Sequence, residues 1–127
     1  MFGRKKNGKV LIVEDDALLA KVLSQGFAAE NFEVGVVENG LESLDMAKKF
    51  QPKIILLDLM LPGIDGFEVL KQLKESEETK NIPVIVISNL DQVSDVKSAK
   101  VLGAEEYFIK ANTQLQKIID YTKSRIG

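Results

Sequence analysis

Short runs of Val, Ile and Leu alternate along the chain with longer segments in which apolar side chains recur every three or four positions. Three runs, at residues 9–13, 54–57 and 84–87, are continuously apolar, which is typical of strands covered on both faces. Weaker runs at residues 32–37 and 107–109 complete a set of five expected strands. Each run is followed by a segment with the periodicity of an amphipathic helix.

The five expected helices are marked by these side chains with helical spacing: Leu19, Val22, Leu23 and Phe27; Leu41, Leu44 and Ala47; Phe67, Leu70 and Leu73; Val93, Val96 and Leu102; and Leu115, Ile118, Ile119 and Thr122. Pro52 and Gly103 mark the ends of the second and fourth segments, and Asn112 or Thr113 is the expected N-cap of the last. Five strand–helix repeats predict an α/β fold, a doubly wound five-stranded parallel sheet with helices on both faces.

Length and charge suit one acidic domain behind a short basic segment. No linker interrupts the 127 residues, so we expect one domain at residues 9–127. We expect residues 1–8 to form a flexible basic leader. The first nine residues hold four of the 17 basic side chains and none of the 19 acidic ones, which leaves the rest at a net charge of −6. Such a domain is unsuited to direct nucleic-acid binding. Without a secretory signal or an apolar run long enough to span a membrane, we expect a cytoplasmic protein with no membrane contact.

The chain contains neither Cys nor His. This excludes thiol chemistry, Cys- or His-ligated metals, a Ser-His-Asp triad and a phosphohistidine carrier. Any chemistry must therefore use carboxylates, hydroxyls, lysines and a hard metal ion.

Polar residues follow the expected strands at the edge where a parallel sheet of this kind binds its ligand. Glu14 and Asp15 follow the first strand, Asp58 the third, Ser88 the fourth and Lys110 the fifth. If the first and third strands are neighbours, three carboxylates meet in one cleft and repel each other unless a cation lies between them. An all-oxygen site of this kind suits Mg²⁺. With a lysine and a hydroxyl beside it, the site could position a phosphoryl group for transfer.

Simpler explanations exist for most of these residues taken singly. An acidic run at a strand end often caps the following helix, and Asp16 fits that role. Ser88 and Lys110 are residue types common on surfaces, and Glu38 lies further out on the same edge. Asp58 is harder to explain as a solvent-exposed residue without a role, because it directly follows four apolar residues. The joint placement of these groups carries the functional interpretation.

In this order and spacing, the residues resemble the receiver domain of response regulators in two-component signalling. The resemblance covers nearly the whole chain and implies the flavodoxin- or CheY-like strand order 2-1-3-4-5. It implies that Asp58 is the phosphoacceptor, and that Glu14, Asp15, Asp58 and the backbone carbonyl of Met60 bind Mg²⁺. The turn at residues 62–66 matches the family's entry into its third helix.

The same resemblance assigns Ser88 and Lys110 to the phosphoryl site and makes Ser88 and Tyr107 the switch. Phosphorylation would then change the surface of the fourth helix, fifth strand and fifth helix, including Val93, Val96, Lys97, Lys100 and Tyr107. Implied partners are a sensor histidine kinase or phosphotransfer protein and a downstream protein target. We expect a monomer, with dimerisation on phosphorylation as the alternative. We expect output through another protein or through a longer regulator of which this chain is a part.

The chain departs from the family's pattern after the lysine, and two further positions bear on the lifetime of the phosphoryl group. Pro usually follows the lysine, often through a cis bond, but here Ala111 follows Lys110. Because a cis bond without proline costs about 2.5–4 kcal/mol, either the bond is trans and the loop is rearranged or strain is stored there. Met60 and Leu90 flank the path of the hydrolytic water in this family, and neither can activate water. We therefore expect slow self-dephosphorylation.

Other classes fit less well. A phosphatase of the haloacid dehalogenase type needs a second Asp where Met60 stands, and a flavodoxin needs a hydroxyl-rich loop after the first strand. Neither G-x-G-x-x-G nor a P-loop is present. We therefore expect no enzyme activity beyond Mg²⁺-dependent self-phosphorylation and slow self-dephosphorylation. The main alternative is a receiver-like interaction module that works without phosphorylation.

Overall fold

The computed structural model describes residues 6–127, in which five strands alternate with five helices. Their bounds are β1 Lys9–Val13, α1 Ala17–Ala29, β2 Glu33–Val37, α2 Ser43–Phe50, β3 Ile54–Leu57, α3 Gly66–Glu75, β4 Val84–Ser88, α4 Val93–Val101, β5 Glu106–Ile109 and α5 Leu115–Ile126. Two short 3₁₀ turns, η1 at Gly40–Glu42 and η2 at Lys110–Asn112, precede α2 and α5. The strand runs seen in the sequence therefore match the observed strands to within one residue at each end.

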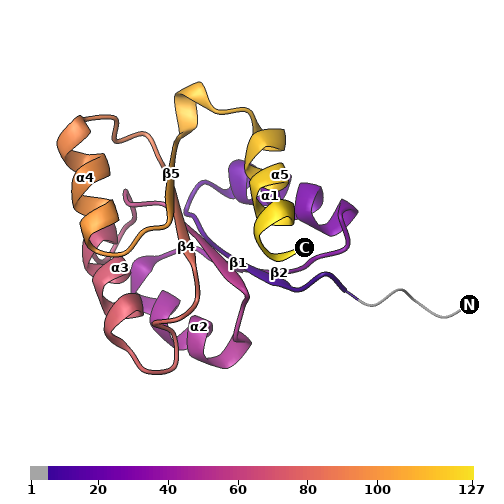
Figure 1. Ribbon diagram of the computed structural model, residues 1–127, viewed down its shortest axis with the longest axis horizontal. Helices are drawn as coiled ribbons and strands as arrows, with labels where there is room; N and C mark the ends of the chain where they lie inside the picture. The colour runs from indigo at the N-terminus through magenta and orange to yellow at the C-terminus, as the bar shows by residue number, and fades with distance from the viewer. Residues whose placement is uncertain (1–5) are drawn as a thin grey trace, which may run out of the picture.

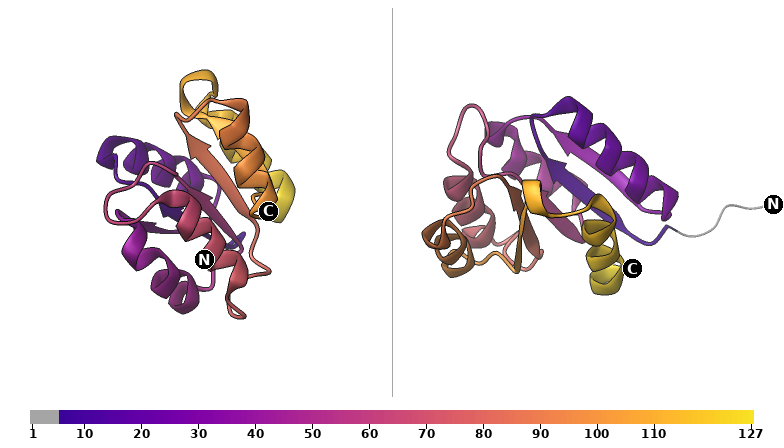
Figure 2. Two further views of the ribbon diagram at one scale, coloured as in Figure 1. Left: turned by 90° about the vertical axis from the view of Figure 1, so that its left-hand side faces the viewer. Right: turned by 90° about the horizontal axis from the view of Figure 1, so that it is seen from above.

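All five strands are parallel and lie in the order β2-β1-β3-β4-β5, which confirms the expected fold. α1 and α5 cover one face of the sheet, and α2, α3 and α4 cover the other (Figures 1 and 2). β1 and β3 lie side by side in the centre, with Val13 opposite Leu57. The residues that follow these two strands are therefore neighbours.

The apolar core has two layers, one on each side of the sheet. Alternate residues of β1 point to opposite faces, so that Leu11 packs under α2–α4 while Ile12 packs under α1 and α5. β3 is buried along its whole length, which explains its continuous apolar sequence. This packing gives the strand ends a rigid base.

Local capping agrees with the sequence at one helix and differs at another. Asp16 caps α1 by accepting hydrogen bonds from the amides of Leu18 and Leu19, as its simpler interpretation predicted. The N-cap of α5 is Gln114, so the expected capping by Asn112 or Thr113 is wrong. The 3₁₀ turn η2 occupies that part of the loop and delays the start of the helix.

The basic leader expected at residues 1–8 is only partly within the described residues, because residues 1–5 lie outside them. Asn7 donates its backbone amide to the carbonyl of Asn31, and Gly8 accepts from the amide of Glu33. The boundary of the leader stays a prediction. Within residues 6–127, no helix is both long and apolar enough to cross a bilayer.

Candidate functional site at the carboxyl edge of the sheet

The carboxyl ends of β1, β3 and β5 bring Glu14, Asp58 and Lys110 together. Backbone hydrogen bonds position the two acids, since the amide of Asp58 donates to the carbonyl of Val13 at 3.0 Å and that of Glu14 to Val37 at 2.9 Å. The adjacency of β1 and β3 that the carboxylate cluster required is therefore present.

Lys110 forms ion pairs with both acids. Its Nζ lies 2.8 Å from Oε1 of Glu14 and 2.8 Å from Oδ2 of Asp58. Both acids are almost completely buried, with 2% of Glu14 and 4% of Asp58 exposed. One cation thus compensates two carboxylates in a region shielded from water.

This arrangement shifts the pKa of Glu14 and the pKa of Lys110. Burial raises the pKa of Glu14 to about 7, and the nearby Asp58 charge adds to the rise while the Lys110 hydrogen bond opposes it. Burial alone would lower the pKa of Lys110, but its hydrogen bonds to Asp58 and Glu14 outweigh that effect and raise it. The lysine therefore stays charged, and the site carries an excess of acid.

Asp15 completes a cluster of three carboxylates. One oxygen from each of Glu14, Asp15 and Asp58 lies within 4.8 Å of the others, and Asp15 is exposed to solvent. Carboxylate oxygens with an open side toward water suit a hard divalent cation that keeps part of its hydration shell, as Mg²⁺ does. The cluster thus fits the magnesium site expected from the sequence.

Met60 contributes its backbone to the site. Its amide donates a hydrogen bond to Oδ1 of Asp58 at 3.0 Å, so the two oxygens of that carboxylate are held by different partners. The Met60 residue is 55% exposed, and Gly66 closes the following loop by donating to the carbonyl of Leu59. Metal binding by the Met60 carbonyl stays a prediction.

Ser88 and Tyr107 both form hydrogen bonds with Leu90, which lies two residues after Ser88 in the β4–α4 loop. Oγ of the fully buried Ser88 accepts the amide of Leu90 at 3.2 Å, and the hydroxyl of Tyr107 donates to the Leu90 carbonyl at 2.7 Å. Tyr107 is directed inward and is buried, which raises the pKa of its hydroxyl. Both predicted switch residues thus bind one loop residue.

The sequence left open whether the Lys110–Ala111 peptide bond is cis or trans. No peptide bond in the described part of the chain is cis, so the Lys110–Ala111 bond is trans. The 3₁₀ turn η2 begins at Lys110 itself. With this trans bond, Lys110 still reaches both acids.

Fold and site together define a receiver domain of two-component signalling, and comparison with known proteins agrees. The family model described as "Response regulator receiver domain" matches residues 10–122, so the chain belongs to this family.

Among its relatives is the polar-differentiation response regulator DivK of Brucella anthropi, 36% identical over 118 residues, which cover 93% of this chain and 95% of that protein. The phosphorylated cyanobacterial phytochrome response regulator RcpA is 30% identical with a TM-score of 0.76, covering 93% of this chain and 90% of that one. The Mn²⁺-bound response regulator Rcp1 is 25% identical with a TM-score of 0.78, covering 92% and 90%.

Two features of the site were not foreseen from the sequence. The bond between Lys110 and Glu14 joins groups 96 positions apart, from strands that are not adjacent in the sheet. The Leu90 carbonyl is a backbone group with no sequence signature. The only available signal was that each residue follows a strand.

Proposed function

We propose that this receiver accepts a phosphoryl group on Asp58 from a phosphohistidine of a partner kinase or phosphotransfer protein. One observation carries the proposal: a buried aspartate at the end of the central strand has one oxygen on the Met60 amide and the other on Lys110. That geometry orients the carboxylate as a nucleophile. The phosphorylated RcpA relative supports it.

In the transfer, an Asp58 oxygen forms a bond to phosphorus while the bond from phosphorus to the imidazole nitrogen of the donor breaks. The electron pair of that bond stays on the imidazole, and the product is an aspartyl phosphate. The ammonium of Lys110, 2.8 Å from Asp58, lies close enough to balance the charge of the arriving phosphoryl oxygens. The Met60 amide holds the nucleophile in place meanwhile.

Glu14, Asp15, Asp58 and the carbonyl of Met60 would hold Mg²⁺. When bound, the ion neutralises negative charge on the phosphoryl group. Glu14 and Asp15 supply the compensating carboxylates, and Lys110 must share Glu14 and Asp58 with the cation. The Mn²⁺-bound Rcp1 relative supports a divalent cation at this kind of site.

Phosphorylation then biases the surface formed by α4, β5 and α5. An aspartyl phosphate attracts Ser88 and Lys110, and any movement of Ser88 acts on Leu90, which Tyr107 also holds. Val93 is exposed at the start of α4, while Val96 packs against the core. The downstream protein target would read this surface, with the protein as a monomer or, once phosphorylated, a dimer.

The test is intact-mass spectrometry after incubation with acetyl phosphate and Mg²⁺, with and without EDTA. We expect one added phosphoryl group that requires the cation and is absent from Asp58→Asn. The control Asp91→Asn, an exposed acid in the β4–α4 loop, should label normally. A folded protein that gains no phosphoryl group from acetyl phosphate or from a kinase would favour the interaction module that works without phosphorylation.

A further inference from the structure

The chain has no Cys, so its three methionines carry all of its sulfur. Peroxides oxidise a thioether to a sulfoxide, which changes a flexible apolar side chain into a polar one. Met1 lies outside the described residues, which leaves Met46 on α2 and Met60 after β3 for comparison. These two methionines lie in different surroundings, and only Met60 contributes to the phosphoryl site.

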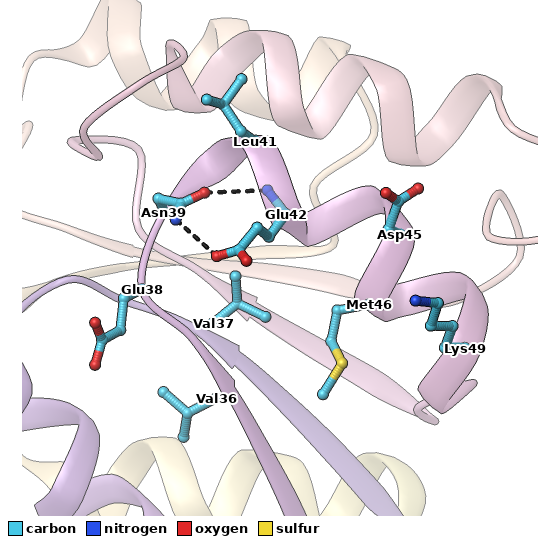
Figure 3. Close-up of a pocket in the computed structure, with 9 residues that line it drawn as sticks. All are labelled: Val36, Val37, Glu38, Asn39, Leu41, Glu42, Asp45, Met46 and Lys49. Carbon is cyan, nitrogen blue, oxygen red and sulfur yellow. Dashed lines mark hydrogen bonds between the residues drawn. The ribbon is translucent and has the colours of Figure 1, made fainter.

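Met46 is half-buried between α2 and the sheet. Figure 3 shows its side chain directed from the helix toward the strands, beside a hollow of about 530 Å³, and it packs against the apolar core. Its terminal methyl group lies against Gly35 of β2, where an added Cβ would stand 3.4 Å from it. The sulfur next to this methyl group is therefore partly shielded from a reagent in solution.

Met60 is open to solvent. The residue is 55% exposed, whereas the preceding Leu59 is 3% exposed and belongs to the core. Met60 is not among the described side chains that pack the two core layers, so a polar group placed on it leaves them intact. Because access controls the oxidation of a side chain, Met60 should react before Met46.

The backbone of Met60 connects this exposed side chain to the phosphoacceptor. Its amide donates to Oδ1 of Asp58 at 3.0 Å, and Asp58 lies in the carboxylate cluster with Glu14 and Asp15. A thioether is a weak hydrogen-bond acceptor, whereas a sulfoxide oxygen is polar and holds water. Oxidation of Met60 therefore changes hydration at the residue that positions the nucleophile.

We propose that Met60 is a peroxide-sensitive residue and that its oxidation shortens the lifetime of the aspartyl phosphate. The inference rests on the proposed phosphorylation of Asp58. The Met60 sulfur forms a bond to one oxygen of hydrogen peroxide while the oxygen–oxygen bond breaks. Sulfur loses two electrons, and the departing hydroxide takes the proton of the transferred oxygen and leaves as water. The sulfoxide then brings water to the acyl phosphate, which the apolar thioether keeps drier.

The test treats the protein with limiting hydrogen peroxide, which is then removed with catalase. Digestion after lysine places Met46 in residues 22–48 and Met60 in residues 54–71, so mass spectrometry reads the added oxygen separately at each. The variant Met60→Leu and its matched control Met46→Leu each replace one thioether with an apolar side chain of similar volume. Treated and untreated proteins are labelled with acetyl phosphate and Mg²⁺, and loss of the phosphoryl group is followed by intact mass.

We expect Met60 to gain oxygen about threefold faster than Met46, or more. Peroxide treatment should accelerate loss of the phosphoryl group about threefold or more in the unmodified protein and in Met46→Leu, but not in Met60→Leu. Equal oxidation of the two methionines, an unchanged decay rate after treatment, or an acceleration that persists in Met60→Leu overturns the proposal. Failure of the proposed function is distinguishable, because the untreated protein would then accept no phosphoryl group at all.

Discussion

Tyr107 and Leu90 are joined by a hydrogen bond of 2.7 Å from the phenolic hydroxyl to the backbone carbonyl. Because the amide of Leu90 also donates to Ser88, this loop residue is held from both sides. Tyr107 of β5 and Ser88 at the end of β4 therefore both bind the backbone of Leu90. Under the proposed mechanism, a change at the phosphoryl site would reach Tyr107 through the Leu90 backbone.

Replacing Tyr107 with Phe should remove the hydrogen bond that holds the Leu90 carbonyl. We expect a loss of about 1 kcal/mol in unfolding free energy, since one hydrogen bond is removed and a partly buried carbonyl loses its donor. Urea denaturation gives the stability, and hydrogen exchange should accelerate at the amides around Leu90. Tyr121→Phe removes a hydroxyl that binds Glu105 instead, and should leave exchange at Leu90 unchanged. Equal exchange in both variants would contradict the proposed hold on the loop.

The raised pKa of Glu14 predicts that stability depends on pH without divalent cations. A carboxyl group with a pKa of about 7 when folded and about 4.5 when unfolded binds more protons in the folded state between these values. Stability should therefore fall as pH rises from about 4.5 to 7, by an amount on the order of 3 kcal/mol, and then level off. Urea denaturation in EDTA at several pH values measures it.

Two comparisons isolate Glu14 in that experiment. Glu14→Gln should flatten the slope, whereas Glu38→Gln, at the end of the neighbouring strand, should retain it. Mg²⁺ should also flatten the slope, because a bound cation favours the carboxylate. A slope that survives in Glu14→Gln would assign the pH dependence to another group.

The sequence determined more of the fold than of the site's internal bonds. The continuously apolar run at residues 54–57 could be assigned to a strand because burial on both faces leaves no polar position. The strand order came from the family resemblance, since periodicity does not say which strands pair. The pairing of Lys110 with Glu14 depends on side-chain reach across the sheet edge, which leaves no pattern along the chain.

Gly66 illustrates a local constraint that follows from packing. A Cβ at this position would meet the backbone of Leu59, which cannot move aside as a flexible side chain can. Gly66→Ala should therefore destabilise the protein by about 2–3 kcal/mol in urea denaturation. Gly26→Ala is the control, because its Cβ would meet only the end of the Ile119 side chain and alanine favours a helix. The control should lose less than half as much.

The lifetime of the aspartyl phosphate tests Met60 and Leu90. Both are apolar and flank the expected path of the attacking water, and the exposed Met60 can be replaced without disturbing the core. Met60→Asn with Leu90→Glu should accelerate dephosphorylation about tenfold, a drop of about 1.4 kcal/mol in the barrier, because polar groups can orient that water. Decay is followed by intact mass after removal of the phosphodonor. Val101→Glu, an exposed change outside the site, should leave the rate unaltered. If the double variant decays at the original rate, access of water is set by other residues, and Lys110, the nearest cation to Asp58, becomes the first to examine.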